Sequence, residues 1–206
     1  LVGSEMCIRD SGKIVKWNDP AIANQNKDLA LPDTQITVVH RSDKSGTTQN
    51  FVSYFKDQAP DSWTHELSEN WPDIPGQQSA KGTSGVVTAV KQADGTIGYA
   101  DFSQVGDLGT AAIKVGENYN EISADAGSKV IEDSEIDTSV KGDNRVVVKI
   151  NHATEAKGAY PIVLVSYDIA CPAYKDASTA KFVKSWLTYV TSDEGQKTAS
   201  SAAGSA

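Results

Sequence analysis

The sequence has no apolar run long enough to cross a membrane. A spanning helix needs about 20 consecutive apolar residues. The longest apolar stretch covers residues 162–170, and Ser166 and Asp168 interrupt it. We therefore expect no transmembrane helix within these 206 residues.

Cysteine is equally scarce, with Cys7 and Cys171 as the only two. Such low use neither supports nor excludes an oxidising compartment. Cys7 lies in an N-terminal stretch that is set apart below, so we expect no disulfide between the two. Cys171 follows an apolar stretch, where a lone cysteine is typical of a small buried residue.

Basic residues are outnumbered. Lys and Arg total 19 against 27 Asp and Glu, which gives a net charge of −8. Nucleic-acid-binding proteins carry basic surfaces, so this balance argues against a nucleic-acid partner. It does not exclude an anionic ligand, because the donors inside a closed cleft decide binding there rather than the distant surface field.

Several catalytic signatures are also missing. The sequence contains no Gly-x-x-x-x-Gly-Lys-Ser/Thr loop for nucleotide phosphates and no Gly-x-Ser-x-Gly nucleophile elbow. The three histidines, His40, His65 and His152, are too scattered to indicate a metal site. We therefore expect no cofactor and no metal.

What the sequence does contain is a polar loop between a strand-like and a helix-like segment. Residues 36–40 are rich in β-branched side chains, and residues 41–48 read Arg-Ser-Asp-Lys-Ser-Gly-Thr-Thr. Phe51, Tyr54 and Phe55 then fall on one helical face. A loop that opens a helix points backbone N–H groups and the positive end of the helix dipole at one place.

The side chains of this loop are mostly donors. Ser45 and Thr47 offer hydroxyls, and Arg41 offers a planar fork that matches an oxyanion. Gly46 lets a ligand approach the backbone closely. The pattern predicts a site for a tetrahedral oxyanion such as phosphate. The plainer alternative is a helix cap beside an exposed ion pair, and the loop alone leaves both open.

A second glycine-rich helix start is a secondary candidate for the same site. It reads Gly82-Thr83-Ser84. It could add donors to an anion, and its alternative role is a helix cap at Thr83 or Ser84.

The remaining pattern alternates strands with helices, which is typical of an α/β fold. We predict helices over residues 20–24, 45–56, 59–69, 83–91 and 178–190 and from Asp193 onward, strands over residues 36–40, 97–99, 111–115, 119–123, 145–150 and 159–170, and a loop over residues 125–142.

Five segments, in order along the chain, resemble the phosphate-binding protein of the high-affinity bacterial phosphate ABC transporter. They are Gly12-Lys13-Ile14 with Trp17 to Ile22, Leu31-Pro32 with residues 36–48, Ile97-Gly98-Tyr99-Ala100-Asp101-Phe102, Tyr160-Pro161-Ile162 to Tyr167, and Ser192-Asp193-Glu194-Gly195-Gln196.

The resemblance implies a two-lobed, periplasmic-binding-protein-like α/β fold, of which mostly the second lobe is present. It implies that Arg41, Ser45, Gly46 and Thr47 bind phosphate, while Asp43 holds Arg41 in place. The implied protein is a solute-binding protein and not an enzyme. Its partners are inorganic phosphate and the membrane permease of the transporter, and its location is extracytoplasmic, in the periplasm or as a cell-surface lipoprotein.

The resemblance also divides the chain. Residues 1–11 resemble a translated sequencing adapter, and we interpret them as a scar outside the fold. Residues 12–158 correspond to the second lobe with the anion loop. Residues 159–206 correspond to the returning part of the first lobe, and we interpret the chain as a fragment that is open at both ends.

Two alternatives remain at this point. The first is a phosphate-ester hydrolase with Ser45 or Thr47 as nucleophile and His40 as base, although the sequence offers no clear group to orient that base. The second is a binding protein for another tetrahedral oxyanion such as sulfate. In the family the acceptor that selects phosphate comes from the first lobe, so selectivity here rests on the resemblance.

Overall fold

The structure of the chain, a computed structural model, describes residue 6, residues 12–142 and residues 144–205. We interpret residues 1–11 as a scar, and of these residues the structure describes only Met6. That side chain is buried and belongs to the main hydrophobic cluster, which the scar interpretation does not predict.

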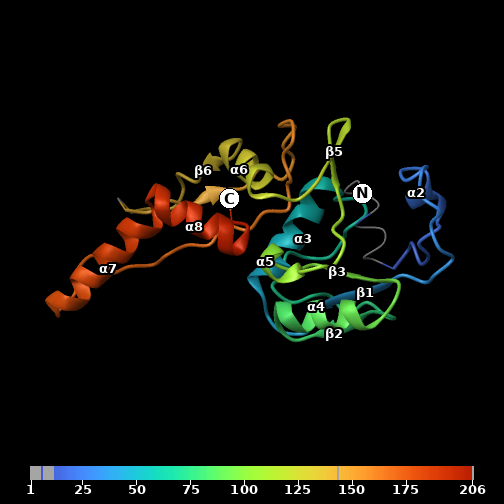
Figure 1. Cartoon of the computed structure of the whole chain (residues 1–206), viewed down its shortest axis with the longest axis horizontal. Coiled ribbons are helices and arrows are strands. Elements are labelled where there is room, and N and C mark those ends of the chain that lie inside the picture. The colour runs from blue at the N-terminus through green and yellow to red at the C-terminus, as the bar shows by residue number, and fades with distance from the viewer. Residues whose placement is uncertain (1–5, 7–11, 143, 206) are drawn as a thin grey trace.

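A small parallel sheet forms the centre of the fold (Figure 1). Strand β1 (Thr37–Arg41) lies between β2 (Gln78–Ala80) and β3 (Thr96–Gly98), and both neighbours run parallel to it. Helix α3 (Gly46–Gln58) connects β1 to β2, and helix α4 (Gly82–Gln92) connects β2 to β3.

Further elements surround this unit. The helices are α2 (Pro20–Ala23), α5 (Phe102–Val105), α6 (Ala124–Glu132), α7 (Ala177–Val190) and α8 (Asp193–Ala203), and the antiparallel pairs are β4 (Ile113–Val115) with β5 (Asn118–Asn120) and β6 (Glu135–Ile136) with β7 (Val148–Lys149). No helix in the described part of the chain is long and apolar enough to cross a membrane.

Strand β1 is covered on both faces. Successive strand residues point to opposite sides, and Val38 and Val39 are both buried. Val38 belongs to the cluster that includes Phe51 and Phe55 of α3. On the α4 side, a side chain added at Gly98 would meet the carbonyl oxygen of Val39 and the side chain of Val86. This burial explains why the β-branched run of residues 36–40 correctly predicted a strand.

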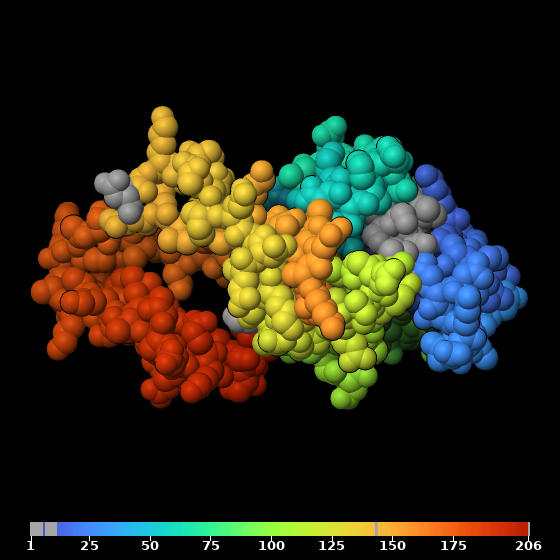
Figure 2. All heavy atoms as spheres, turned by 90° about the horizontal axis from the view of Figure 1, so that it is seen from above, coloured from blue at the N-terminus to red at the C-terminus, as the bar shows by residue number. Residues whose placement is uncertain are grey.

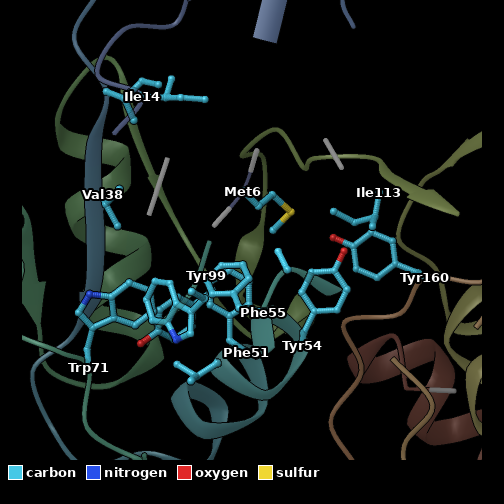
Figure 3. Close-up of a cluster of buried hydrophobic side chains, with 14 of the residues drawn as sticks. Met6, Ile14, Val38, Phe51, Tyr54, Phe55, Trp71, Tyr99, Ile113 and Tyr160 are labelled. Atoms are coloured by element: carbon cyan, nitrogen blue, oxygen red, sulfur yellow. The ribbon is translucent and has the colours of Figure 1, made fainter. Parts of the chain in front are cut away.

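The core is rich in aromatic side chains (Figure 3). Phe51 and Phe55, four residues apart on α3, lie 4.4 Å apart between ring centroids. Trp63 lies 4.9 Å from Phe55, and Trp71 lies 5.2 Å from Trp63. Large apolar surfaces of this kind contribute most of the stability of a small domain.

Two predicted secondary structures are wrong in the middle of the chain. Residues 59–69 form turns and irregular structure instead of a helix. Trp63 is drawn into the core, and the carbonyl oxygen of Glu69 accepts a hydrogen bond from the N–H of Ser45, so this segment follows the anion loop. The predicted loop over residues 125–142 instead begins with α6, because Ser123 caps the helix and Ala126 and Val130 are buried four residues apart.

The predicted strand over residues 159–170 is also wrong. The segment pairs with no strand among the described residues, and Ile169 is 96% exposed. A strand is stabilised by hydrogen bonds to a neighbouring strand, which local sequence cannot supply. The expected burial of Cys171 fails for the same reason, and its thiol is exposed and unpaired.

Helix α7 has the predicted position but a partly uncovered apolar face. None of its residues is buried, and Phe182 is 70% exposed and Trp186 50% exposed. In Figures 1 and 2 the helix extends away from the parallel sheet, at the opposite end of the molecule from α2. Val183 and Leu187 are half-buried, so the described chain covers only part of this apolar face.

Tyr160 is expected to make the stability of the fold decrease at alkaline pH. Burial raises the pKa of its phenol from 10.0 to about 12. The folded pKa lies above the unfolded one, so this contribution is fully present below about pH 10 and is lost as the pH rises toward about 12. We expect the loss to be on the order of 2–3 kcal/mol.

Urea unfolding at about pH 9 and about pH 11 measures about half of this loss, because pH 11 lies midway between the two pKa values. Tyr160→Phe should show a smaller decrease between the two pH values than the unsubstituted chain. Tyr119→Phe, which changes an exposed tyrosine, is the matched control. Equal decreases in all three chains would contradict the assignment.

Candidate functional site

The predicted anion loop lies between the end of β1 and the start of α3. Ser45 is the N-cap of α3, and its Oγ accepts hydrogen bonds from the backbone N–H groups of Thr47 (3.1 Å) and Thr48 (3.4 Å). The structure therefore confirms the alternative prediction that Ser45 caps the helix, because the lone pairs of its hydroxyl accept these two hydrogen bonds. A hydroxyl also carries a proton, and no described residue accepts the proton of Ser45, so the cap does not exclude donation to a ligand.

Arg41 and Asp43 form a bidentate ion pair. Arg41 Nε donates to Asp43 Oδ1 at 2.8 Å, and Arg41 Nη2 donates to Asp43 Oδ2 at 2.6 Å. These hydrogen bonds raise the pKa of the Arg41 guanidinium and hold the pKa of the Asp43 carboxyl well below its usual range. The N–H of Gly82 also donates to Asp43 Oδ1, at 2.9 Å, and lowers the same pKa. Both groups therefore stay charged near neutral pH.

The remaining donors of Arg41 define where an anion can bind. A guanidinium carries five N–H groups, and two of them point at Asp43. A third, on Nη1, meets Thr83 Oγ1 at 3.5 Å. Among the described residues the other two, one on each Nη atom, have no acceptor. Guanidinium N–H groups without an acceptor can donate to the oxygens of a tetrahedral anion.

Gly46 and Thr47 add donors in the same loop. The N–H of Gly46, at the first position of α3, has no acceptor among the described residues, and neither does the Thr47 hydroxyl. A Cβ added at Gly46 would meet nothing within 4 Å, and the backbone there is not left-handed. The structure of the chain itself therefore gives no reason for glycine at this position.

The secondary candidate site, Gly82 to Ser84 at the start of α4, lies beside the Arg41–Asp43 ion pair but has a different role from the predicted one. Neither Thr83 nor Ser84 is the N-cap, which is Lys81 without a side-chain cap bond. Gly82, with a positive φ of 69°, donates to Asp43, and Thr83 Oγ1 donates to Asp101 Oδ2 at 2.8 Å. Ser84 is exposed and takes no part in these contacts. Gly82 and Thr83 thus support the ion pair.

Two residues of this network carried no predicted role. Tyr99 contacts both ends of the loop through its hydroxyl, and Asp101 accepts the Thr83 hydroxyl. Both belong to the segment Ile97-Gly98-Tyr99-Ala100-Asp101-Phe102. Both residues come directly after β3. Because the ends of parallel strands meet at one edge of a sheet, this position could have indicated that they lie near the loop after β1.

The predicted base does not face the predicted nucleophiles. His40 Nδ1 lies 3.0 Å from the carbonyl oxygen of Arg41, and its ring stacks on Trp71 with centroids 5.5 Å apart. No hydrogen bond joins His40 to Ser45 or Thr47 among the described residues. In the same residues, no group of three or more His, Cys, Asp or Glu side chains could hold a metal ion.

A cavity in the described chain lies elsewhere. It has a volume of about 800 Å³ and is lined mainly by apolar side chains of the loop after α2, of α4 and of β3, including Leu31, Val86 and Ile97. None of its lining residues belongs to the loop of residues 41–48. The candidate site is therefore separate from this cavity.

Relatives of the chain are named for phosphate. Phosphate-binding protein PstS 3 of Mycobacterium leprae is 36% identical over 182 residues, which cover 86% of this chain and 48% of the relative. Phosphate-binding protein PstS of Xylella fastidiosa is 34% identical over 197 residues, covering 91% and 51% respectively. The chain spans about half the length of the curated relatives it matches.

Solved structures share the fold. A high-affinity periplasmic phosphate-binding protein bound with phosphate matches with a TM-score of 0.67 at 18% identity, over 100% of this chain and 61% of that one. A putative phosphate ABC transporter substrate-binding protein from Clostridium perfringens, with bound phosphate, gives 0.51 at 20% identity, over 98% and 61%. The fold is thus periplasmic-binding-protein-like, as predicted. Residues 11–194 match the model described as the PBP superfamily domain, and the chain belongs to that family.

Proposed function

We propose that this chain is part of a solute-binding protein that captures inorganic phosphate for uptake by an ABC transporter. The observation that carries the proposal is the fork of Arg41. Asp43 holds it from one side, and two of its N–H groups have no acceptor among the described residues, in the same loop as the N–H of Gly46. The names of the relatives support phosphate as the ligand.

Arg41, Ser45, Gly46 and Thr47 are the proposed ligands of the anion. They combine one fixed positive charge with two hydroxyls, a backbone N–H and the N-terminus of α3. Asp43 is a positioning residue, because both of its oxygens accept hydrogen bonds from Arg41. Capture then needs no covalent step, and affinity comes from many convergent donors that are shielded from water.

The proposal includes the first lobe, which closes over the anion from the other side. Residues 12–158 form the lobe with the loop, and residues 159–206 belong to the other lobe. The exposed apolar face of α7 and the unpaired segment 159–170 support this division, because both need a covering partner. The proposed partner in the membrane is the permease of the transporter, and the proposed location is extracytoplasmic.

Titration tests the proposal directly. The chain is joined to the part of a relative that it does not match and is titrated calorimetrically with phosphate and with sulfate. We expect stoichiometric phosphate binding that sulfate does not compete away. A folded protein that binds neither anion would overturn the proposal, and equal binding of both would overturn phosphate selectivity.

Turnover separates capture from the hydrolase alternative. We expect no release of product from a chromogenic phosphate ester, because His40 is engaged by Arg41 and Trp71. Turnover that Ser45→Ala abolishes would instead establish the hydrolase.

Gly46→Ala separates ligand binding from stability. The new Cβ meets nothing in the chain, so the free energy of unfolding should hold or rise by about 0.4–1 kcal/mol. The same Cβ would occupy the space of the anion, so phosphate affinity should fall about tenfold or more, about 1.4 kcal/mol.

Gly109→Ala is the matched control for this prediction. Its Cβ also meets nothing, and it lies outside the loop. Calorimetric titration and urea unfolding of both variants make the comparison. Unchanged phosphate affinity in Gly46→Ala would show that no ligand approaches this position.

A further inference from the structure

The hydroxyl of Tyr99 connects the two ends of the anion loop. The backbone N–H of Arg41 donates to Tyr99 Oη at 3.2 Å. Thr48 Oγ1 lies 2.6 Å from the same oxygen. Arg41 ends β1, and Thr48 lies in the first turn of α3, so one phenol oxygen joins the strand to the helix on either side of the loop.

The ring of Tyr99 is itself firmly held. It is 9% exposed and stacks on Phe51 with centroids 4.7 Å apart and on Trp71 at 5.5 Å. Thr48, its partner, is fully buried. Both partners are therefore fixed by packing, and a hydrogen bond between fixed groups defines a position more sharply than one between mobile groups. Figure 3 shows the Tyr99 ring within the aromatic cluster, above Phe51.

The same contact extends to the proposed ligands. The N–H of Thr48 donates to Ser45 Oγ, so the residue that meets Tyr99 also fixes the Ser45 hydroxyl. Arg41, whose N–H meets Tyr99, carries the guanidinium. Loss of the phenol oxygen would leave the Arg41 N–H and the Thr48 hydroxyl without this partner in a buried place, which is costly and loosens both ends of the loop.

We propose that Tyr99 is a positioning residue of the anion site, acting through its hydroxyl on Arg41 and Thr48. The inference rests on the proposed function of the loop. It assigns Tyr99 no contact with the ligand. Small displacements of donors weaken recognition strongly, because each hydrogen bond depends on distance and angle.

The test is an NMR titration with inorganic phosphate of the 206-residue chain joined to the part of a relative that it does not match, followed at the backbone amides of Arg41, Gly46 and Thr47. Tyr99→Phe keeps the ring and removes only the hydroxyl. We expect its Kd for phosphate to rise about tenfold. Tyr119→Phe, whose exposed hydroxyl donates to Gln25, should keep the Kd of the unsubstituted chain.

Two further variants separate positioning from a general loss of stability. Ile113→Val removes a methylene group from the core and should lower stability without changing the Kd. Thr48→Val keeps the shape of the side chain and removes the hydroxyl. On that background, Tyr99→Phe should raise the Kd much less than it does alone, because the two hydroxyls act as a pair.

The outcomes are distinct. If the unsubstituted chain shows no phosphate-dependent shifts, the proposed function of the loop fails. If that chain binds and Tyr99→Phe binds equally well, only the role of Tyr99 fails. An equal rise in Kd for Ile113→Val and Tyr99→Phe would also overturn the positioning role.

Discussion

Arg41→Ala is expected to weaken phosphate binding by on the order of 2–5 kcal/mol, which is the largest effect of any substitution in the site. The variant removes the only charged donor among the four proposed ligands. It also leaves the Asp43 carboxylate beside the anion without its partner, so an attraction is replaced by a repulsion. Asp43→Asn should have a smaller effect, because the guanidinium charge remains and only its orientation is loosened.

The measurement is a calorimetric phosphate titration of the chain joined to the complementary part of a relative. Arg145→Ala is the matched control, since Arg145 is exposed and lies outside the loop. Urea unfolding of both variants verifies that each remains folded. Phosphate affinity that survives in Arg41→Ala would show that the anion binds elsewhere.

Phe55→Ala is expected to lower the free energy of unfolding by about 3–5 kcal/mol. Phe55 is fully buried, and its ring lies between Phe51 at 4.4 Å and Trp63 at 4.9 Å. Truncation would leave a cavity between α3 and the segment of residues 59–69, which also supports the loop through Ser45 and Glu69. Neighbouring rings are too rigid to fill that space completely.

Urea unfolding followed by tryptophan fluorescence measures the loss. Phe182→Ala is the matched control, because it makes the same change on a helix at a position that is 70% exposed. We expect that variant to change the free energy of unfolding by no more than about 0.5 kcal/mol. Comparable losses in both variants would mean that α7 is packed as tightly as α3.

The core and the loop differ in how far local sequence determined them. Strand β1 and helix α3 were predicted closely, because a β-branched run and an apolar helical face are both local signals. The Arg41–Asp43 pair is local as well, since the two residues are two positions apart. Ser45 is confirmed as a helix cap by its contacts, and its role as a donor to an anion stays a prediction.

Long-range contacts decided the rest. Thr83 was predicted as a cap, yet its hydroxyl bonds Asp101 because α4 begins beside the end of β3. Tyr99 lies 58 residues from Arg41, and no spacing rule connects them. Helix α6 was missed because its buried face is narrow, with Ala126 and Val130 among polar neighbours.

The sequence by itself determined which segments can form β1, α3 and α7, and which residues of the loop can donate to an anion, because propensity, periodicity and side-chain chemistry are local properties. Only the tertiary structure decided that segment 159–170 is not a strand and that Tyr99, Thr83 and Gly82 support the loop. The physical reason is that strand pairing and side-chain networks depend on a partner distant in sequence, and folding alone brings that partner into reach.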